Sequence, residues 1–219
     1  MRATWLDFFA NFFTSRRATD CLGILDFTGC RELWLQGQMA LHLRDSLDET
    51  PPKCPECRAF DTNALLSKGL GRQDLALWRD LGKTDLAAAL ELKILGGEYQ
   101  PKTLLGAGGM EAVRRYWNDI QRRPGKLARI RKGTTNWGLI GDYQRLADLK
   151  RQCPSADMVL CLLVDNRKKT KVGLARSDTA LANVLEGIHF ASRAEYRQVE
   201  CVADPRIQFR LWRIGAEQC

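Results

Sequence analysis

Two charged residues, Glu91 and Lys93, stand inside an otherwise apolar run that extends from Leu86 to Leu95. They are two positions apart, so in a β-strand their side chains point to the same face of the sheet. Burying an unpaired carboxylate or ammonium group costs several kcal/mol. The pair therefore indicates a partner at this place, often a metal ion or a substrate.

The register of a predicted hairpin brings a second carboxylate, that of Asp74, close to Glu91. With a four-residue connection at 81–84, the opposed pairs are Asp80 and Asp85, Trp78 and Ala87, Ala76 and Ala89, and Asp74 and Glu91. Opposed side chains lie about 4.5–5.5 Å apart, and two carboxylates at that distance repel unless a cation lies between them. Asp85 shares the face of Glu91 but lies roughly 20 Å away along the strand, which excludes it.

Two carboxylates beside a backbone carbonyl form an oxygen-rich site, which suits Mg²⁺ or Mn²⁺ better than zinc. The ammonium group of Lys93 can position or deprotonate a water molecule there and offset the charge that builds up on a phosphate. The residue types therefore predict metal-assisted hydrolysis of a phosphate ester.

Asp74, sixteen further residues and then Glu91-Leu92-Lys93 at the end of an apolar strand resemble the signature of the PD-(D/E)xK, or restriction-endonuclease-like, nuclease superfamily. The resemblance implies an α/β fold with a mixed central β-sheet flanked by helices. It also implies that Asp74, Glu91 and the backbone carbonyl of Leu92 bind the metal ion, and that Lys93 orients the attacking water. Members of this superfamily mostly hydrolyse DNA phosphodiesters and leave a 5′-phosphate.

The same resemblance assigns roles to residues on two predicted helices. Glu32, on the helix before the strands, would bind a second metal ion or a water molecule. An acid in the first turn of a helix is also favoured by the helix dipole alone. Gln144, on a later helix, would be an auxiliary site residue. The chain departs from the superfamily pattern at Gln73, which stands where the proline of the motif would be, and this proline carries no catalytic group.

Helices and strands must position these residues, and the hydrophobic periodicity predicts their places in the chain. The order of these elements is typical of one α/β domain with a mixed sheet. The predicted helices are 3–14, 31–47, 110–123, 139–152 and 178–185, and the predicted strands are 59–66, 75–78, 86–95, 158–164, 196–202 and 207–214. We expect a single nuclease-like domain over 1–219. It comprises an N-terminal helical appendage (1–30), a catalytic core (31–165), and a C-terminal helix and strands (166–219).

The net charge of +8 favours a polyanionic partner. Positive charge concentrates between residues 114 and 132, where one acid, Asp119, accompanies eight basic residues: Arg114, Arg115, Arg122, Arg123, Lys126, Arg129, Arg131 and Lys132. A solvated helix face and loop would also have this composition. The concentration favours a surface that faces the phosphates of DNA, duplex or single-stranded.

Among the eight cysteines, Cys54 and Cys57 form the one Cys-x-x-Cys pair. A structural zinc site wants four ligands, typically two such pairs, so reduced thiols are the preferred interpretation, and a small zinc-bound scaffold that uses Cys54 and Cys57 stays as a third alternative. No apolar run reaches the roughly 20 residues that a membrane crossing needs. Asp7 and Asn11 interrupt the aromatic N-terminal stretch, and basic residues follow it rather than precede it. The expected location is cytoplasmic, with no membrane partner.

Together these features predict a Mg²⁺- or Mn²⁺-dependent nuclease that acts on DNA. The alternative is a catalytically degenerate module of the same fold, which binds nucleic acid or helps to assemble a larger complex. A homodimer or a larger protein complex is compatible with either function.

Overall fold

A computed structural model describes residues 4–15, 31–49, 54–67, 71–96, 138–167, 195–201 and 204–215. Its helices are α1 (Trp5–Thr14), α3 (Arg31–Asp48) and α6 (Gly138–Gln152). Its strands are β1 (Ala59–Ser67), β2 (Gly71–Trp78), β3 (Leu86–Gly96), β4 (Asp157–Asp165), β5 (Glu195–Glu200) and β6 (Ile207–Ile214). These elements agree with the predicted ones to within a few residues, except that β2 begins four residues early. The predicted helices 110–123 and 178–185 lie outside the described residues.

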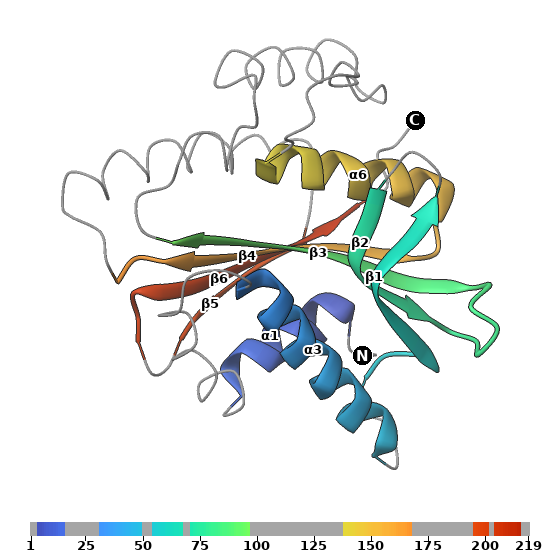
Figure 1. Cartoon of the computed structure of the whole chain (residues 1–219), viewed down its shortest axis with the longest axis horizontal. Helices are drawn as coiled ribbons and strands as arrows, with labels where there is room; N and C mark the ends of the chain where they lie inside the picture. Colours follow the sequence, from blue (N-terminus) through green and yellow to red (C-terminus); the bar gives the residue numbers. More distant parts are fainter. Residues whose placement is uncertain are drawn as a thin grey trace, which may run out of the picture.

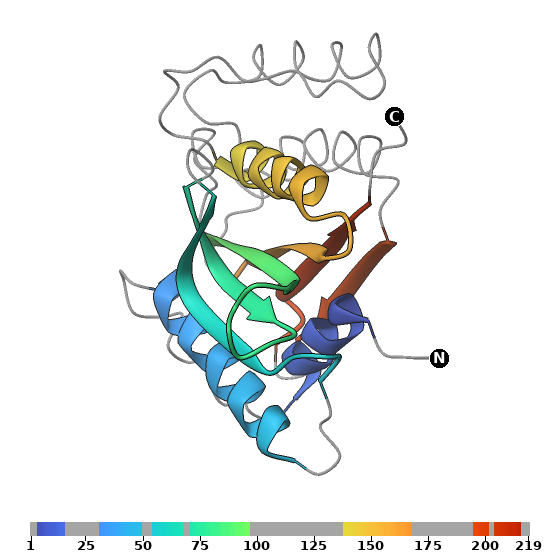
Figure 2. The same cartoon turned by 90° about the vertical axis from the view of Figure 1, so that its right-hand side faces the viewer.

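The six strands form one mixed sheet in the order β1-β2-β3-β4-β6-β5. Strands β3 and β4 run parallel, and every other pair of neighbours is antiparallel. Helix α6 covers one face of the sheet, and α1 and α3 cover the other (Figures 1 and 2). The predicted α/β class, with a mixed sheet flanked by helices, is thereby confirmed.

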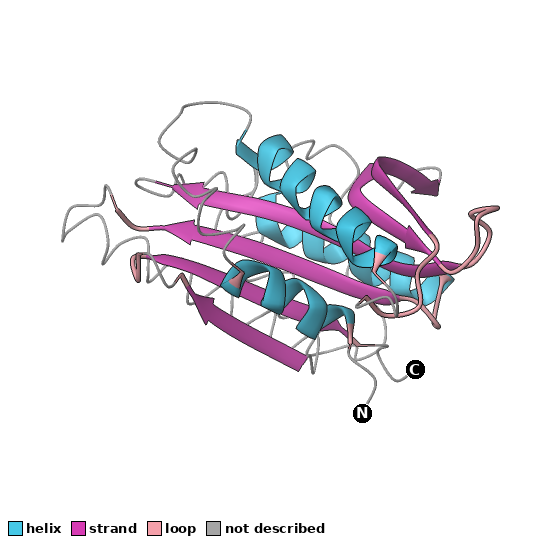
Figure 3. Ribbon diagram, turned by 90° about the horizontal axis from the view of Figure 1, so that it is seen from below, coloured by secondary structure: helices cyan, strands magenta, loops and turns pink. Residues whose placement is uncertain are grey.

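Strand β4 lies at the centre of the sheet and is buried on both faces. Its even-numbered residues from Met158 to Val164 join the apolar cluster beneath α6. Its odd-numbered residues from Val159 to Leu163 join the cluster against α1 and α3, which lie across the strands in Figure 3. The uninterrupted apolar sequence of β4 follows from this double cover.

Helix α1 is largely buried and packs against β5 and β6. The hydroxyl of Thr4 caps it by accepting a hydrogen bond from the backbone N–H of Asp7 at 3.1 Å. Seven of its ten residues are buried, and the ring of Phe13 stacks on that of Phe209 in β6 at a centroid distance of 3.9 Å. None of the described helices combines the length and apolar character that crossing a membrane requires.

The hairpin of β2 and β3 differs from its predicted register near the turn. Trp78 pairs with Leu86, and the backbone N–H of Arg79 bonds to the carbonyl of Asp85, so the predicted pairs of Trp78 with Ala87 and of Asp80 with Asp85 are wrong. The turn is longer because the carboxylate of Asp80 accepts hydrogen bonds from the backbone N–H groups of both Thr84 and Asp85.

A β-bulge at Ala87 absorbs the extra residue of the turn. Beyond it Leu77 pairs with Ala88, and Ala76 pairs with Ala89 as predicted. The bulge thus restores the parity on which the alignment of Asp74 with Glu91 depends.

The packing of α1 predicts that Phe13→Ala destabilises the fold. Removing a fully buried phenyl ring leaves a cavity under β6, and we expect a loss of about 3–5 kcal/mol in the free energy of unfolding. Urea denaturation followed by circular dichroism measures this loss. The matched control is Leu33→Ala, because the side chain of Leu33 is exposed on α3, and its effect should stay within about 0.5 kcal/mol. Equal effects of the two substitutions would contradict this account of the core.

Candidate active site

The candidate site lies where β2 parts from β3. The register of the two strands ends at the pair Leu75 and Leu90. Further along β3, side-chain carboxylates take over the backbone donors. Asp74 accepts the N–H of Leu92 at 2.6 Å, and Glu32 accepts the N–H of Ile94 at 3.1 Å. The predicted opposition of Asp74 and Glu91 thus falls one residue beyond the paired ladder, and Asp74 is held by its carboxylate instead.

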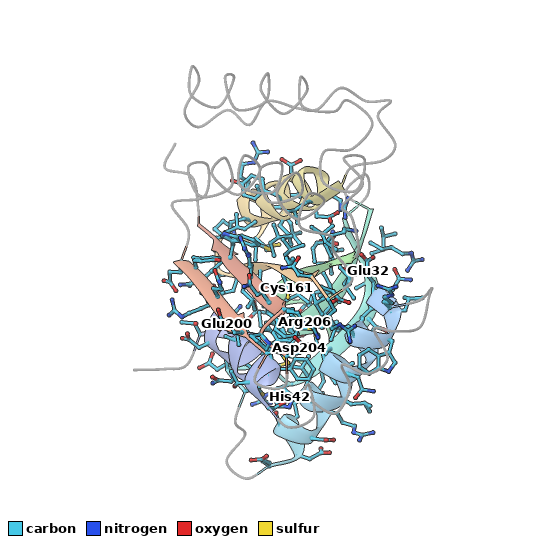
Figure 4. The ribbon with its side chains drawn as sticks, turned by 90° about the vertical axis from the view of Figure 1, so that its left-hand side faces the viewer. Glu32, His42, Cys161, Glu200, Asp204 and Arg206 are labelled. Carbon is cyan, nitrogen blue, oxygen red and sulfur yellow. The ribbon has the colours of Figure 1, made fainter. Side chains whose placement is uncertain are left out.

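The first two turns of α3 lie beside the fork, which is the place where β2 and β3 separate after the pair Leu75 and Leu90. Glu32 is in the first turn of the helix, and Figure 4 shows it beside the end of the sheet. One turn later the buried amide of Gln36 donates a hydrogen bond to the backbone carbonyl of Asp74. Residues four apart lie on one helical face, so α3 presents Glu32 and Gln36 together to the backbone on both sides of the fork.

Helix α6 supplies an ion pair from the opposite face of the sheet. Arg145 places its Nε atom 3.2 Å from Oε1 of Glu91 and its Nη2 atom 2.6 Å from Oδ1 of Asp142. The Nζ atom of Lys93 lies 3.4 Å from Oδ2 of Asp142 and 3.5 Å from Oε1 of Glu32. As predicted, Glu91 and Lys93 share a face of β3, and both have charged partners there.

Burial disfavours the charged forms of the two central carboxylates. It raises the pKa of Asp74 to about 6, with further increases from Asp142 and Glu32, although the N–H of Leu92 and the charge of Lys93 act in the opposite direction. Burial and the neighbouring charge of Asp142 also raise the pKa of Glu91, against the lowering effect of Arg145. A nearby cation would therefore be strongly favoured by both carboxylates.

Lys93 remains an ammonium ion at neutral pH. Burial lowers its pKa, but the charges of Asp142, Glu32 and Asp74 together outweigh burial and hold the pKa above its ordinary value. A group of this kind donates hydrogen bonds and stabilises negative charge. Of the two roles that the sequence allows for Lys93, orienting a water molecule fits this environment, whereas deprotonating one does not.

The structure brings four of the predicted site residues together, namely Asp74, Glu91, Lys93 and Glu32. Gln144 lies within α6, but its side chain is outside the described part of the structure, as is the whole basic segment 114–132.

The sequence argument missed Gln36, Asp142 and Arg145. A signal for Asp142 was present, since it falls between Leu139 and Leu146 on the apolar stripe of the helix, where a carboxylate is as unusual as Glu91 is in its strand.

The donors at the site suit a hard divalent cation, but they do not form a ready-made cage. Four carboxylates, those of Glu32, Asp74, Glu91 and Asp142, outnumber the two cationic groups of Lys93 and Arg145. In an extended strand the N–H and C=O of one residue point to the same side, so the carbonyl of Leu92 also faces Asp74. Within the described ranges, however, no three acidic, histidine or cysteine side chains are placed to hold a metal ion as they lie.

Cys54 and Cys57 are free thiols whose surroundings affect their ionisation. Cys57 is buried, and burial raises the pKa of both thiols above the ordinary value, to about 11 for Cys57. The raised pKa values keep both groups as thiols in the metal-free protein.

The raised pKa of Asp74 predicts an unusual pH dependence for the metal-free protein. Its folded pKa of about 6 exceeds the ordinary value of 3.8, so between these values the native state holds a proton that the unfolded chain has lost. The contribution of Asp74 to stability therefore rises as the pH falls through this window and is lost above it.

Asp74→Asn should accordingly be more stable than the wild type at pH 8, with the advantage shrinking towards pH 4 by about 2 kcal/mol. Chemical denaturation of both proteins in EDTA across this range measures the difference, and groups common to both proteins largely cancel in it. A difference that does not change with pH would contradict the assignment.

No protein-family model, curated protein or solved structure matches this chain. The function of the chain must therefore be inferred from its own residues. These are an acid on β2, a Glu-x-Lys on β3 and an acid on α3, gathered at one point of a mixed sheet that helices cover on both faces.

Proposed function

We propose that the chain is a divalent-metal-dependent nuclease of the restriction-endonuclease-like fold, and that it hydrolyses phosphodiester bonds in DNA. The observation that carries the proposal is the convergence of Asp74, Glu91 and Lys93 where β2 parts from β3. Their charges act on one another: burial raises the pKa of the two carboxylates, and neighbouring carboxylates raise the pKa of Lys93 against the effect of burial. Buried carboxylates with raised pKa values next to a cationic group are typical of catalytic sites.

In this proposal Asp74, Glu91 and the carbonyl of Leu92 hold Mg²⁺ or Mn²⁺, which when bound polarises the phosphate and increases the acidity of a coordinated water. Lys93 donates a hydrogen bond to the attacking water and stabilises negative charge on the phosphate. Glu32 holds the ammonium group of Lys93 in place while accepting the N–H of Ile94. The hydrogen bond from Gln36 fixes the backbone of Asp74.

Arginines near the carboxyl ends of β3 and β4 support an anionic substrate. Gly96 pairs with Asp165, three residues beyond the pair of Lys93 with Leu162, so Asp165 lies roughly 10 Å further along the sheet. The guanidinium group of Arg167 donates two hydrogen bonds to the carboxylate of Asp165. The positive charge of Arg31 also lowers the pKa of this carboxylate. The substrate would meet positive charge on this side of the site.

One observation favours the second candidate, a nucleic-acid-binding or assembly module with degenerate catalysis. Arg145 already forms ion pairs with both Glu91 and Asp142, and Lys93 adds a second cation beside Asp142. An internal ion-pair network of this kind is stable without a metal ion. A module of this class would bind DNA equally well in Mg²⁺ and in EDTA and would leave it intact.

The test of the proposal is cleavage of duplex DNA, single-stranded DNA and RNA in Mg²⁺, Mn²⁺ and EDTA. We expect metal-dependent cleavage of DNA by the wild type. Lys93→Ala should reduce the rate on the order of 100-fold or more, because a positioned donor near the reacting phosphate is lost. The matched control is Lys83→Ala, since Lys83 is an exposed lysine in the turn of the same hairpin and pairs with Asp61. This variant should cut at the wild-type rate.

Absence of cleavage by the wild type in both metals would reject the enzymatic function. Equal rates for Lys93→Ala and Lys83→Ala would reject the assigned site, even if the protein cuts DNA. Binding of labelled DNA, measured by fluorescence anisotropy at several salt concentrations, separates a degenerate binding module from a protein that has no nucleic-acid partner.

A further inference from the structure

We infer that Arg145 is an internal counter-ion that a divalent metal ion displaces, and that Asp142, released from it, becomes a metal ligand together with Glu91. The inference rests on the proposed function, because it concerns the same site. It adds to that site a ligand from α6 and a guanidinium group that stands in the place of the cation.

The position of Arg145 is that of a cation shared by two carboxylates. Its Nη2 atom lies 2.6 Å from Oδ1 of Asp142 and 3.2 Å from Oε1 of Glu91. Both carboxylate side chains are almost fully buried, whereas the arginine side chain retains 23% of its exposure. Arg145 is thus the most exposed of the three side chains, so its rotation is the movement that would separate the guanidinium group from carboxylates that stay in place.

The contact with Glu91 is of a kind that a metal ion can outcompete. The Nε and Nη2 atoms of Arg145 both approach the same oxygen, Oε1, at 3.2 Å. The strongest arginine–carboxylate pairs use two parallel hydrogen bonds to two oxygens at about 2.7–2.9 Å. A divalent cation brings twice the charge into a smaller space, so it binds the same oxygens more strongly in a buried setting.

A buried oxygen of Asp142 supplies an independent sign of a missing ligand. Its Oδ2 atom is inaccessible to solvent and accepts no hydrogen bond of good geometry from the part of the chain that the structure describes. Lys93 Nζ is the nearby cation, at 3.4 Å. A buried carboxylate oxygen that has only a long ion pair is incompletely satisfied, which is costly. This oxygen lies on the side of Asp142 that faces Lys93, so it has unused acceptor capacity for a metal ion there.

The experiment measures Mn²⁺ affinity by isothermal titration calorimetry at pH 8, for the full chain and without substrate. Arg145→Gln removes the competing charge and should tighten Mn²⁺ binding on the order of tenfold. The matched control is Arg151→Gln. Arg151 lies on the same helix and pairs with Asp148 at the same spacing of three residues, but it is more exposed. Its Mn²⁺ affinity should equal that of the wild type. Asp142→Asn should weaken binding at least tenfold.

A second measurement follows the wild type by NMR, in case Arg145→Gln does not fold. The Nε–Hε resonance of Arg145, assigned by its loss in Arg145→Lys, should shift along a Mg²⁺ titration with the midpoint that calorimetry of the wild type with Mg²⁺ gives. A resonance that stays unchanged while the metal binds would overturn the inference.

The remaining outcomes separate this inference from the proposed function. If the wild type binds Mn²⁺ but Arg145→Gln binds no more tightly than Arg151→Gln, the inference fails and the nuclease remains. If Arg145→Gln binds Mn²⁺ and the wild type does not, Arg145 is a permanent counter-ion that the metal ion does not displace, and the inference fails. That result still supports the position of the metal site, but it rejects metal-dependent catalysis by the wild type. If none of these folded variants binds Mn²⁺, both proposals fail.

Discussion

The candidate site depends on the need to satisfy backbone donors where β2 leaves β3. A buried N–H without an acceptor costs about as much as a lost hydrogen bond, and β2 provides no further pair after Leu75 and Leu90. The carboxylates of Asp74 and Glu32 accept the N–H groups of Leu92 and Ile94. The fork thus requires acceptors at these two points, and carboxylates that meet the requirement are also fixed in position for chemistry.

The same fork concentrates negative charge that the fold must neutralise. Removing one partner of a buried ion pair commonly costs 3–5 kcal/mol in proteins, so Lys93 and Arg145 stabilise the fold whatever else they do at the candidate site. Because carboxylates outnumber cations, the site retains a deficit of positive charge after both have been counted. Active sites often keep such a local instability, which the rest of the fold offsets, here through the large apolar clusters on either side of the sheet.

Much of this arrangement could be predicted from the sequence, because alternation in a strand is a local property. The shared face of Glu91 and Lys93 follows from it, and the burial of β4 follows from its uninterrupted apolar sequence. The nearness of Asp74 depends in addition on the register of the hairpin. The turn could not be predicted, since Asp80 lengthens it by bonding to its far end and Ala87 then bulges. The longer turn and the bulge each shift the register by one residue, and the two shifts cancel. Without the bulge, Asp74 would lie opposite Leu90 and face α3.

Local sequence patterns could not predict that α6 supplies Asp142 and Arg145 to the site, and the reason lies in the topology of the sheet. Strands β3 and β4 are parallel, and a parallel connection must cross over the sheet, usually through a helix. Helix α6 lies in that connection, so Arg145 reaches Glu91 across 54 positions of sequence. No spacing rule joins the two residues. What joins them is that each is a charged group on a surface that is otherwise buried, and a buried charge needs an opposite charge within reach. A search for sites in α/β chains therefore gains from matching misplaced charges on strands with misplaced charges on the crossover helices that follow them.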